Sequence, residues 1–180
     1  QNTSGEITAE ATYEGSTYDG SADIAIAESD VIPTEVYFNP ESASFAGSDT
    51  VTVDLMMETD SPMLSWKIEL GFQPTRVSCV DVEILGTNGI FGSAANRLIT
   101  DLEWDNTNGL ILMGAAGQAD GFEGVSDTGI LARIKFIALV ADPASDLVFT
   151  NDPLEIYNFP VSNPAVKAIF VNTTNGQITE

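Results

Sequence analysis

Carboxylates are the residues of this chain with the most chemistry to offer. The 180-residue sequence holds 27 Asp and Glu, no His and one Cys. Without histidine it lacks the commonest general base, the usual serine and cysteine triads and the commonest zinc ligand. Glycosidic hydrolysis needs only two carboxylates roughly 5–9 Å apart, and Asp101, Glu103 and Asp105 alternate along one stretch. Chance proximity is common among so many acids and nothing indicates an aromatic-lined cleft, so we do not expect an enzyme.

Oxygen-rich loops raise the separate question of calcium. Asp120, Glu123 and Asp127 lie in one polar loop, and residues 105–108 form another. Neither loop has the twelve-residue EF-hand spacing. We therefore expect solvated loops and no cofactor, with a weak surface calcium site as the alternative. The single Cys79 excludes an internal disulfide and lies in an alternating apolar stretch, which predicts a buried thiol.

The charge balance limits the partners. Six basic residues against 27 acidic ones leave a net charge of −21. Nucleic acids and anionic membranes are poor partners, because both are bound through Lys and Arg. The longest apolar run, residues 134–141, contains Lys135 and is far short of the roughly 20 residues that span a membrane. The acidity fits the solvated surface of an extracellular or high-salt protein, and divalent-cation binding is the alternative.

The elements that would position any site are β-strands. Residues 64–72 alternate apolar side chains with Ser65, Lys67 and Glu69, so one face is predicted to be buried and the other wet. Similar short strands, separated by turn signals such as Asn108-Gly109, recur along the chain. We expect them at residues 36–38, 50–59, 64–72, 76–85, 98–104, 110–116, 129–140, 147–149, 155–157, 166–171 and 175–178. We expect about nine regular strands from these eleven stretches and no amphipathic helix, which predicts an all-β sandwich with jelly-roll topology.

The first part of the chain differs in composition. Residues 1–31 are rich in Ser, Thr, Gly, Ala and acids and contain no Lys or Arg. We expect an exposed N-terminal linker, with an extra edge strand at 22–27 as a possible ordered piece. Residues 32–180 are expected to form the sandwich. The absence of an initiating Met and of a signal peptide indicates a mature or trimmed chain.

The order of the landmarks after residue 34 resembles a cohesin domain. The stretch at 46–53, Ala-Gly-Ser-Asp-Thr-Val-Thr-Val, is similar to the opening of that family. Residues 70–77 resemble its following segment, with Gln73 where the family usually has Asp. Residues 110–116, 127–136 and 175–179 resemble its later strands and closing turn.

The resemblance implies a nine-stranded jelly roll without catalytic activity. One sheet face would bind a dockerin, a small calcium-loaded helical module. The outward residues that the resemblance assigns to this face are Ser65, Lys67 and Glu69, then Ile111, Met113 and Ala115, then Leu131, Arg133 and Lys135. Ser65 and Lys67 stand where well-known members carry an Asn-x-Asp pair, which indicates a divergent dockerin as the partner.

The residues themselves support an interaction surface. Lys67, Arg133 and Lys135 are three of the six basic residues, and we expect them on outward positions of one sheet. Such a patch could orient an acidic partner; cross-strand pairing with Glu69, Asp101 and Glu103 is the alternative. Exposed Ile111, Met113 and Leu131 would form the apolar centre of the interface. Alternatively, the loop at 117–127 or the N-terminal segment covers them.

We therefore expect a secreted or cell-surface protein-interaction module with a dockerin-type partner. The alternative is a carbohydrate-binding or surface-layer jelly roll. That function would need a row of exposed aromatic residues, whereas Trp66 and Trp104 both fall in register with core residues. We predict that both are part of the core.

Overall fold

The fold is described here from a computed structural model. The described residues are 3–13, 16–26, 34–45, 47–85, 89–92, 94–117, 124–150, 155–158, 167–168 and 171–180. The chain divides into two compact units, Gln1–Val31 and Ile32–Glu180.

The smaller unit is a β-hairpin. Strands β1 (Thr3–Tyr13) and β2 (Ser16–Ile26) pair antiparallel, from Tyr13 opposite Ser16 to Thr3 opposite Ile26. Residues 22–26 are in a strand, as expected for the ordered piece at 22–27, but this strand is longer and pairs with β1 in a hairpin. The period-two alternation that favours strands is present in both halves of this segment, whereas its Gly and Ser residues are typical of a linker.

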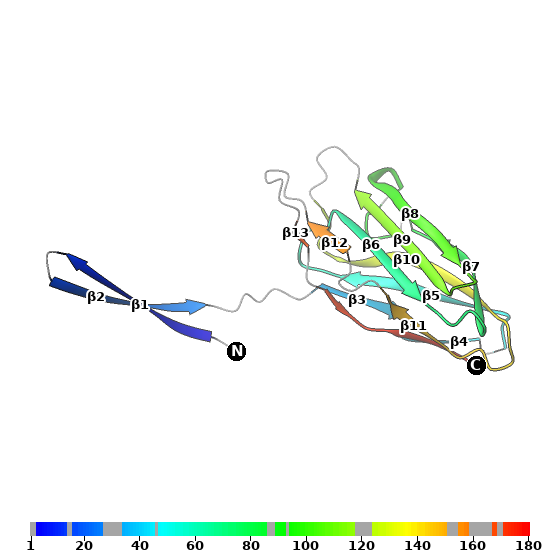
Figure 1. Ribbon diagram of the computed structural model, residues 1–180. Coiled ribbons are helices and arrows are strands. Elements are labelled where there is room, and N and C mark those ends of the chain that lie inside the picture. The colour runs from blue at the N-terminus through cyan, green and yellow to red at the C-terminus, as the bar shows by residue number, and fades with distance from the viewer. Residues whose placement is uncertain are drawn as a thin grey trace. The chain divides into compact units, whose positions relative to one another are not determined.

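The described part of the larger unit consists of strands and one short 3₁₀ helix (Figure 1). Its described elements are β3 (Thr34–Asn39), β4 (Ser42–Ser44), β5 (Thr50–Glu58), β6 (Ser65–Gly71), β7 (Val77–Glu83), η1 (Ala94–Asn96), β8 (Arg97–Asp105), β9 (Leu110–Gly117), β10 (Thr128–Ala138), β11 (Ser145–Phe149), β12 (Glu155–Asn158), β13 (Lys167–Ala168), β14 (Val171–Thr173) and β15 (Gly176–Thr179). The all-β prediction is confirmed. The described segments outnumber the nine expected strands, because several of them, such as β4 and β13, are only two or three residues long.

Two sheets form the sandwich, which confirms the predicted jelly-roll architecture. The first sheet has the order β14-β3-β5-β10-β7. In the second sheet, β6 pairs with β9 on one side, and β9 in turn pairs with β8. On its other side β6 pairs with both β11 and β12, and the sheet continues through β15 to β4. Thus β6 lies inside its sheet, whereas β7 and β8 are each the last described strand at one edge of their sheets.

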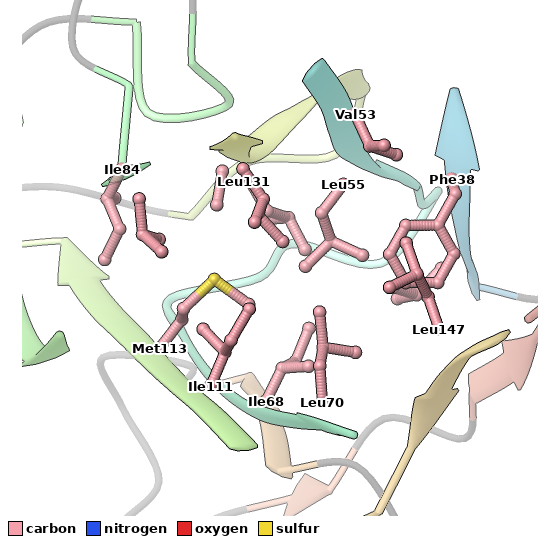
Figure 2. Close-up of a cluster of buried hydrophobic side chains, with 14 of the residues drawn as sticks. Phe38, Val53, Leu55, Ile68, Leu70, Ile84, Ile111, Met113, Leu131 and Leu147 are labelled. Carbon is pink, nitrogen blue, oxygen red and sulfur yellow. The ribbon is translucent and has the colours of Figure 1, made fainter. Parts of the chain in front are cut away.

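The core lies between the two sheets (Figure 2). Trp66, Ile68 and Leu70 of β6 are at most 2% exposed, which confirms the buried face predicted for this strand. They belong to the same buried cluster as Leu55 of β5 and Phe136 of β10. Each large apolar side chain buried in this way contributes roughly 1.5–3 kcal/mol to folding. Burial therefore strongly determines which residues of β6 face the core.

The turn after β8 fixes the pairing of β8 with β9. Gly109 adopts a φ of +68°, and its amide donates to the carbonyl of Asp105 at 2.8 Å. A Cβ at this position would lie 2.2 Å from the carbonyl oxygen of Phe72, so only glycine fits. The predicted Asn108-Gly109 hairpin is confirmed.

Among the described residues, no helix is long and apolar enough to cross a membrane.

Candidate functional site

The outer face of β6, β9 and β8 is the strongest candidate surface; we call it the β6 face. Residues that pair across strands lie on the same side of a sheet, and the alternate residues of β6 are in the core. Three rows of outward residues follow from the register. The rows are Ser65–Ala116–Leu98, Lys67–Gly114–Asp101 and Glu69–Leu112–Glu103.

An ion pair crosses the middle row. Lys67 Nζ lies 3.3 Å from Asp101 Oδ1, although β9 separates the two strands. Gly114 makes this possible, because a Cβ there would lie 2.7 Å from Thr100 Oγ1 and 3.0 Å from Asp101 Oδ2. The Lys67 and Asp101 side chains are 39% and 27% exposed, so the pair contributes about 0–1 kcal/mol to stability. Its main effect is to fix a charged group of each sign at the centre of the β6 face.

Apolar side chains surround this ion pair. Leu110, Leu112 and Ala116 on β9 are half-buried, and Leu98 on β8 is 53% exposed. Glu69 lies beside them and accepts a hydrogen bond from Thr150 Oγ1 at 2.5 Å. A sheet face that mixes partly exposed apolar side chains with oriented charges is typical of an interaction surface.

The predicted site residues on β9 do not face outward. Ile111, Met113 and Ala115 are at most 1% exposed, and Figure 2 shows Ile111 and Met113 within the core cluster. The prediction was wrong by one residue, because residues 110–116 contain no polar side chain that could mark the wet face. The outward residues of β9 are Leu110, Leu112, Gly114 and Ala116.

Leu131 is also a core residue. It is 1% exposed and, like its neighbour Ala132, belongs to the core cluster. The pairing of β10 with β5 shifts register between Ile130 and Ala132, which marks a β-bulge. An extra residue interrupts strict alternation, so the period-two pattern placed Leu131 on the wrong side.

The three basic residues do not share a face. Arg133 and Lys135 lie on β10 in the first sheet, whereas Lys67 lies on β6 in the second. The expected single patch is therefore wrong, because local alternation does not determine which sheet a strand joins. Arg133 donates from Nε and Nη2 to the two oxygens of Asp54 at 2.7 and 2.9 Å, and this partner raises the pKa of the guanidinium. Cross-strand pairing, the alternative for these bases, is confirmed for Lys67 with Asp101.

Two of the three carboxylates on β8 have structural partners. Asp101 pairs with Lys67, and Asp105 accepts hydrogen bonds from the amides of Thr107 and Asn108. The hydrogen bond from the Asn108 side chain, together with these two backbone bonds, lowers the pKa of Asp105. Within the described part of the chain, no three acidic, Cys or His side chains come together as a metal site. The other suggested calcium loop includes Asp120 and Glu123, which lie outside the described residues.

The aromatic and thiol predictions have mixed outcomes. Trp66 is 2% exposed, as predicted, but Trp104 is 39% exposed although it lies opposite the core residue Ile111. Trp104 is exposed because β8 is at the end of its sheet. Cys79 is buried as expected, and burial raises the pKa of its thiol to about 12. The loop at 117–127, the alternative cover for the face, falls largely outside the described residues.

Comparison with known proteins identifies the architecture. No protein-family model matches the sequence, and a comparison with curated proteins finds no match. Solved structures do match. The cohesin CaCohA2 from Clostridium acetobutylicum superposes with a TM-score of 0.62 at 18% identity, covering 83% of this chain and 91% of that one. This chain has the cohesin fold.

Other cohesins give similar values. The cohesin of the Coh-OlpC–Doc435 complex from Clostridium thermocellum has a TM-score of 0.61 at 16% identity, over 85% of this chain and 96% of that one. A non-cellulosomal cohesin from the archaeon Archaeoglobus fulgidus has a TM-score of 0.57 at 20% identity, over 82% and 91% of the two chains. The cohesin resemblance inferred from the order of motifs is thus confirmed at the level of fold, across large sequence divergence.

Proposed function

We propose that this cohesin-fold chain is a non-catalytic protein-interaction module that binds a dockerin-type partner through the β6 face. The observation that carries the proposal is the composition of this face. Half-buried leucines of β9 and exposed Leu98 surround the ion pair of Lys67 and Asp101. Apolar area supplies affinity and the fixed charges supply orientation.

The solved neighbours support this choice of partner. One is a complex of a Clostridium acetobutylicum cohesin with the dockerin CaDoc0917, and another joins a cohesin of Acetivibrio cellulolyticus ScaC to the ScaB dockerin. A dockerin-type partner would carry its own calcium, as the family resemblance implies. Extracellular or cell-surface assembly is the setting that fits both this partner class and the net charge of −21.

The arrangement of the middle row suggests how a partner is oriented. Lys67 and Asp101 are held close across Gly114, so a partner meets a dipole at a fixed place on the face. An acidic group of the partner would bind beside Lys67 and a donor beside Asp101. Lys67→Glu would place a second negative group beside Asp101, and the two would repel the acidic group of the same partner.

Calorimetric titration with dockerin-type modules from the same genome tests this function, with calcium and with a chelator. We expect calcium-dependent binding by the wild-type chain and about tenfold or greater weakening by Lys67→Glu. Arg133→Glu is the matched control, because it reverses one positive charge on the other sheet. It should leave the affinity within about threefold of wild type.

Two results would contradict the proposal. Equal weakening by both charge reversals would indicate a general charge effect instead of a binding face. Retention on a polysaccharide without binding to any dockerin would favour the carbohydrate-binding alternative on the same fold.

A further inference from the structure

Exposed apolar side chains of this protein concentrate on one edge strand. Eight large apolar residues of the described chain are strongly exposed, and four of them lie on β8: Leu98, Ile99, Leu102 and Trp104, at 39–53%. A fifth, Val80 on β7, is 41% exposed. Single exposed apolar residues are common, but four on one nine-residue strand are an unusual local concentration.

Three of these residues are on the inner side of the sheet. Ile99, Leu102 and Trp104 pair in register with Ala115, Met113 and Ile111, all of which are core residues. They are exposed because the core side of β8 is not fully covered. The outer side of β8 contributes to the β6 face, so this inner row is a separate surface.

The free edge of β8 is bordered at its two ends by one contact to β7 and one contact to the residue that follows β7. Asn106, just after β8, donates from Nδ2 to the carbonyl of Cys79 at 2.9 Å, and its Oδ1 accepts from the Cys79 amide at 2.8 Å. These two bonds pair the backbone groups of Cys79 on the edge of β7. At the other end of β8, the Arg97 guanidinium donates to the carbonyl of Ile84. Between these contacts, the described residues include no strand paired with β8 opposite β9.

We propose that the β8 edge binds an extended segment of a partner protein by strand addition, and that this segment alternates apolar and basic residues. Its backbone would pair with the free edge of β8. Its apolar side chains would pack beside Ile99, Leu102 and Trp104. Its basic side chains would lie on the outer side, next to Glu103 and Asp105.

Charge favours a basic partner segment over a second copy of the chain as the occupant of the β8 edge. Asp101, Glu103 and Asp105 follow the outer side of β8, and Glu103 is exposed. Two antiparallel β8 strands would place these acids beside each other, and each copy carries a net charge of −21. A basic segment would be attracted by the same charges.

The test uses a nine-residue peptide that alternates lysine and valine, added to the full chain. Trp104 emission should shift to shorter wavelength on binding, since the other tryptophan, Trp66, is only 2% exposed. Amide hydrogen exchange should slow specifically along β8. A peptide that alternates glutamate and valine, and the lysine peptide with N-methylated amides on its pairing edge, should both fail to bind.

Variants separate the edge from other exposed apolar sites. Leu102→Lys should weaken the lysine peptide by about tenfold or more, whereas the matched control Val140→Lys changes a residue that is 42% exposed outside β8. Val140→Lys should leave binding unchanged. Glu103→Lys should weaken the lysine peptide and permit the glutamate peptide to bind.

Three outcomes would overturn the inference. One is equal binding of the N-methylated peptide, and another is equal weakening by Leu102→Lys and Val140→Lys. The third is sedimentation of the chain alone as a dimer that Leu102→Lys dissociates, which would make a second copy the occupant. None of these results depends on a dockerin, so the inference and the proposed function can fail separately.

Discussion

The alternation of core and outward residues along β9 can be tested by comparing two neighbouring residues of this strand. Met113 is 0% exposed and pairs with core residue Ile68, whereas its neighbour Leu112 faces outward and is half-buried. Met113→Ala removes buried volume that the core cannot fully refill, so it should cost about 2–5 kcal/mol of unfolding free energy. Leu112→Ala should cost less than about 1 kcal/mol.

Urea and thermal unfolding followed by circular dichroism measure the two losses. For a domain of about 150 residues, each kcal/mol lowers the midpoint by roughly 2–4 °C, so Met113→Ala should melt about 5–15 °C earlier. The urea m-value should stay constant, since a change in the midpoint alone reports stability. In titrations with a dockerin that binds, only Leu112→Ala should weaken affinity.

A larger loss of stability from Leu112→Ala than from Met113→Ala would refute the assignment of Met113 to the core and of Leu112 to the outer face. It would place Met113 outward, as the sequence pattern first suggested. Equal losses would show that the outer face of β9 is covered to the same extent as the core side, which would also remove the β6 face as a docking surface.

The remaining predictions concern β7, the β8–β9 turn and the first sheet. Asn106→Ala should cost about 1–3 kcal/mol in urea unfolding, because it leaves the amide and carbonyl of Cys79 unpaired. The Cys79 thiol, with a pKa of about 12, should react with a thiol reagent at pH 8 only at the rate of unfolding. Hydrogen bonds lower the Asp105 pKa in the folded state, so its stabilising effect is present above about pH 4 and lost as pH falls through the folded pKa. The stability difference between wild type and Asp105→Asn should therefore shrink on acidification. Glu35→Lys should raise stability by about 0.2–1 kcal/mol, because Glu35 lies opposite Glu58.

Alternation with polar residues decided which parts of the site could be predicted. Ser65, Lys67 and Glu69 mark the wet face of β6, and the structure has the predicted phase there. The apolar β9 offers no such marker, so its phase depends on pairing with β6. The bulge at Leu131 adds a residue that no period-two pattern contains.

Information about whole sheets is less accessible from sequence. The assignment of β6 and β10 to different sheets separates Lys67 from Arg133, although both strands alternate in the same way. The position of β8 at the end of its sheet exposes Trp104, whose register is that of a core residue. Fold class could be predicted because turn spacing and apolar alternation are local, whereas edges and sheet membership are set by contacts distant in sequence.

The parallel pairing of the first and last strands has a mechanical consequence. Strands β14 and β15 run parallel to β3 and β4, with Thr34 opposite Val171 at one end and Ser44 opposite Thr179 at the other. Tension between Thr34 and Thr179 pulls the two segments in opposite directions along their length, so their shared hydrogen bonds are loaded in shear and resist together. The hairpin is loaded differently, because Thr3 and Ile26 are a pair and tension between them opens one pair after another. Under force, we therefore expect the hairpin to open before the sandwich yields.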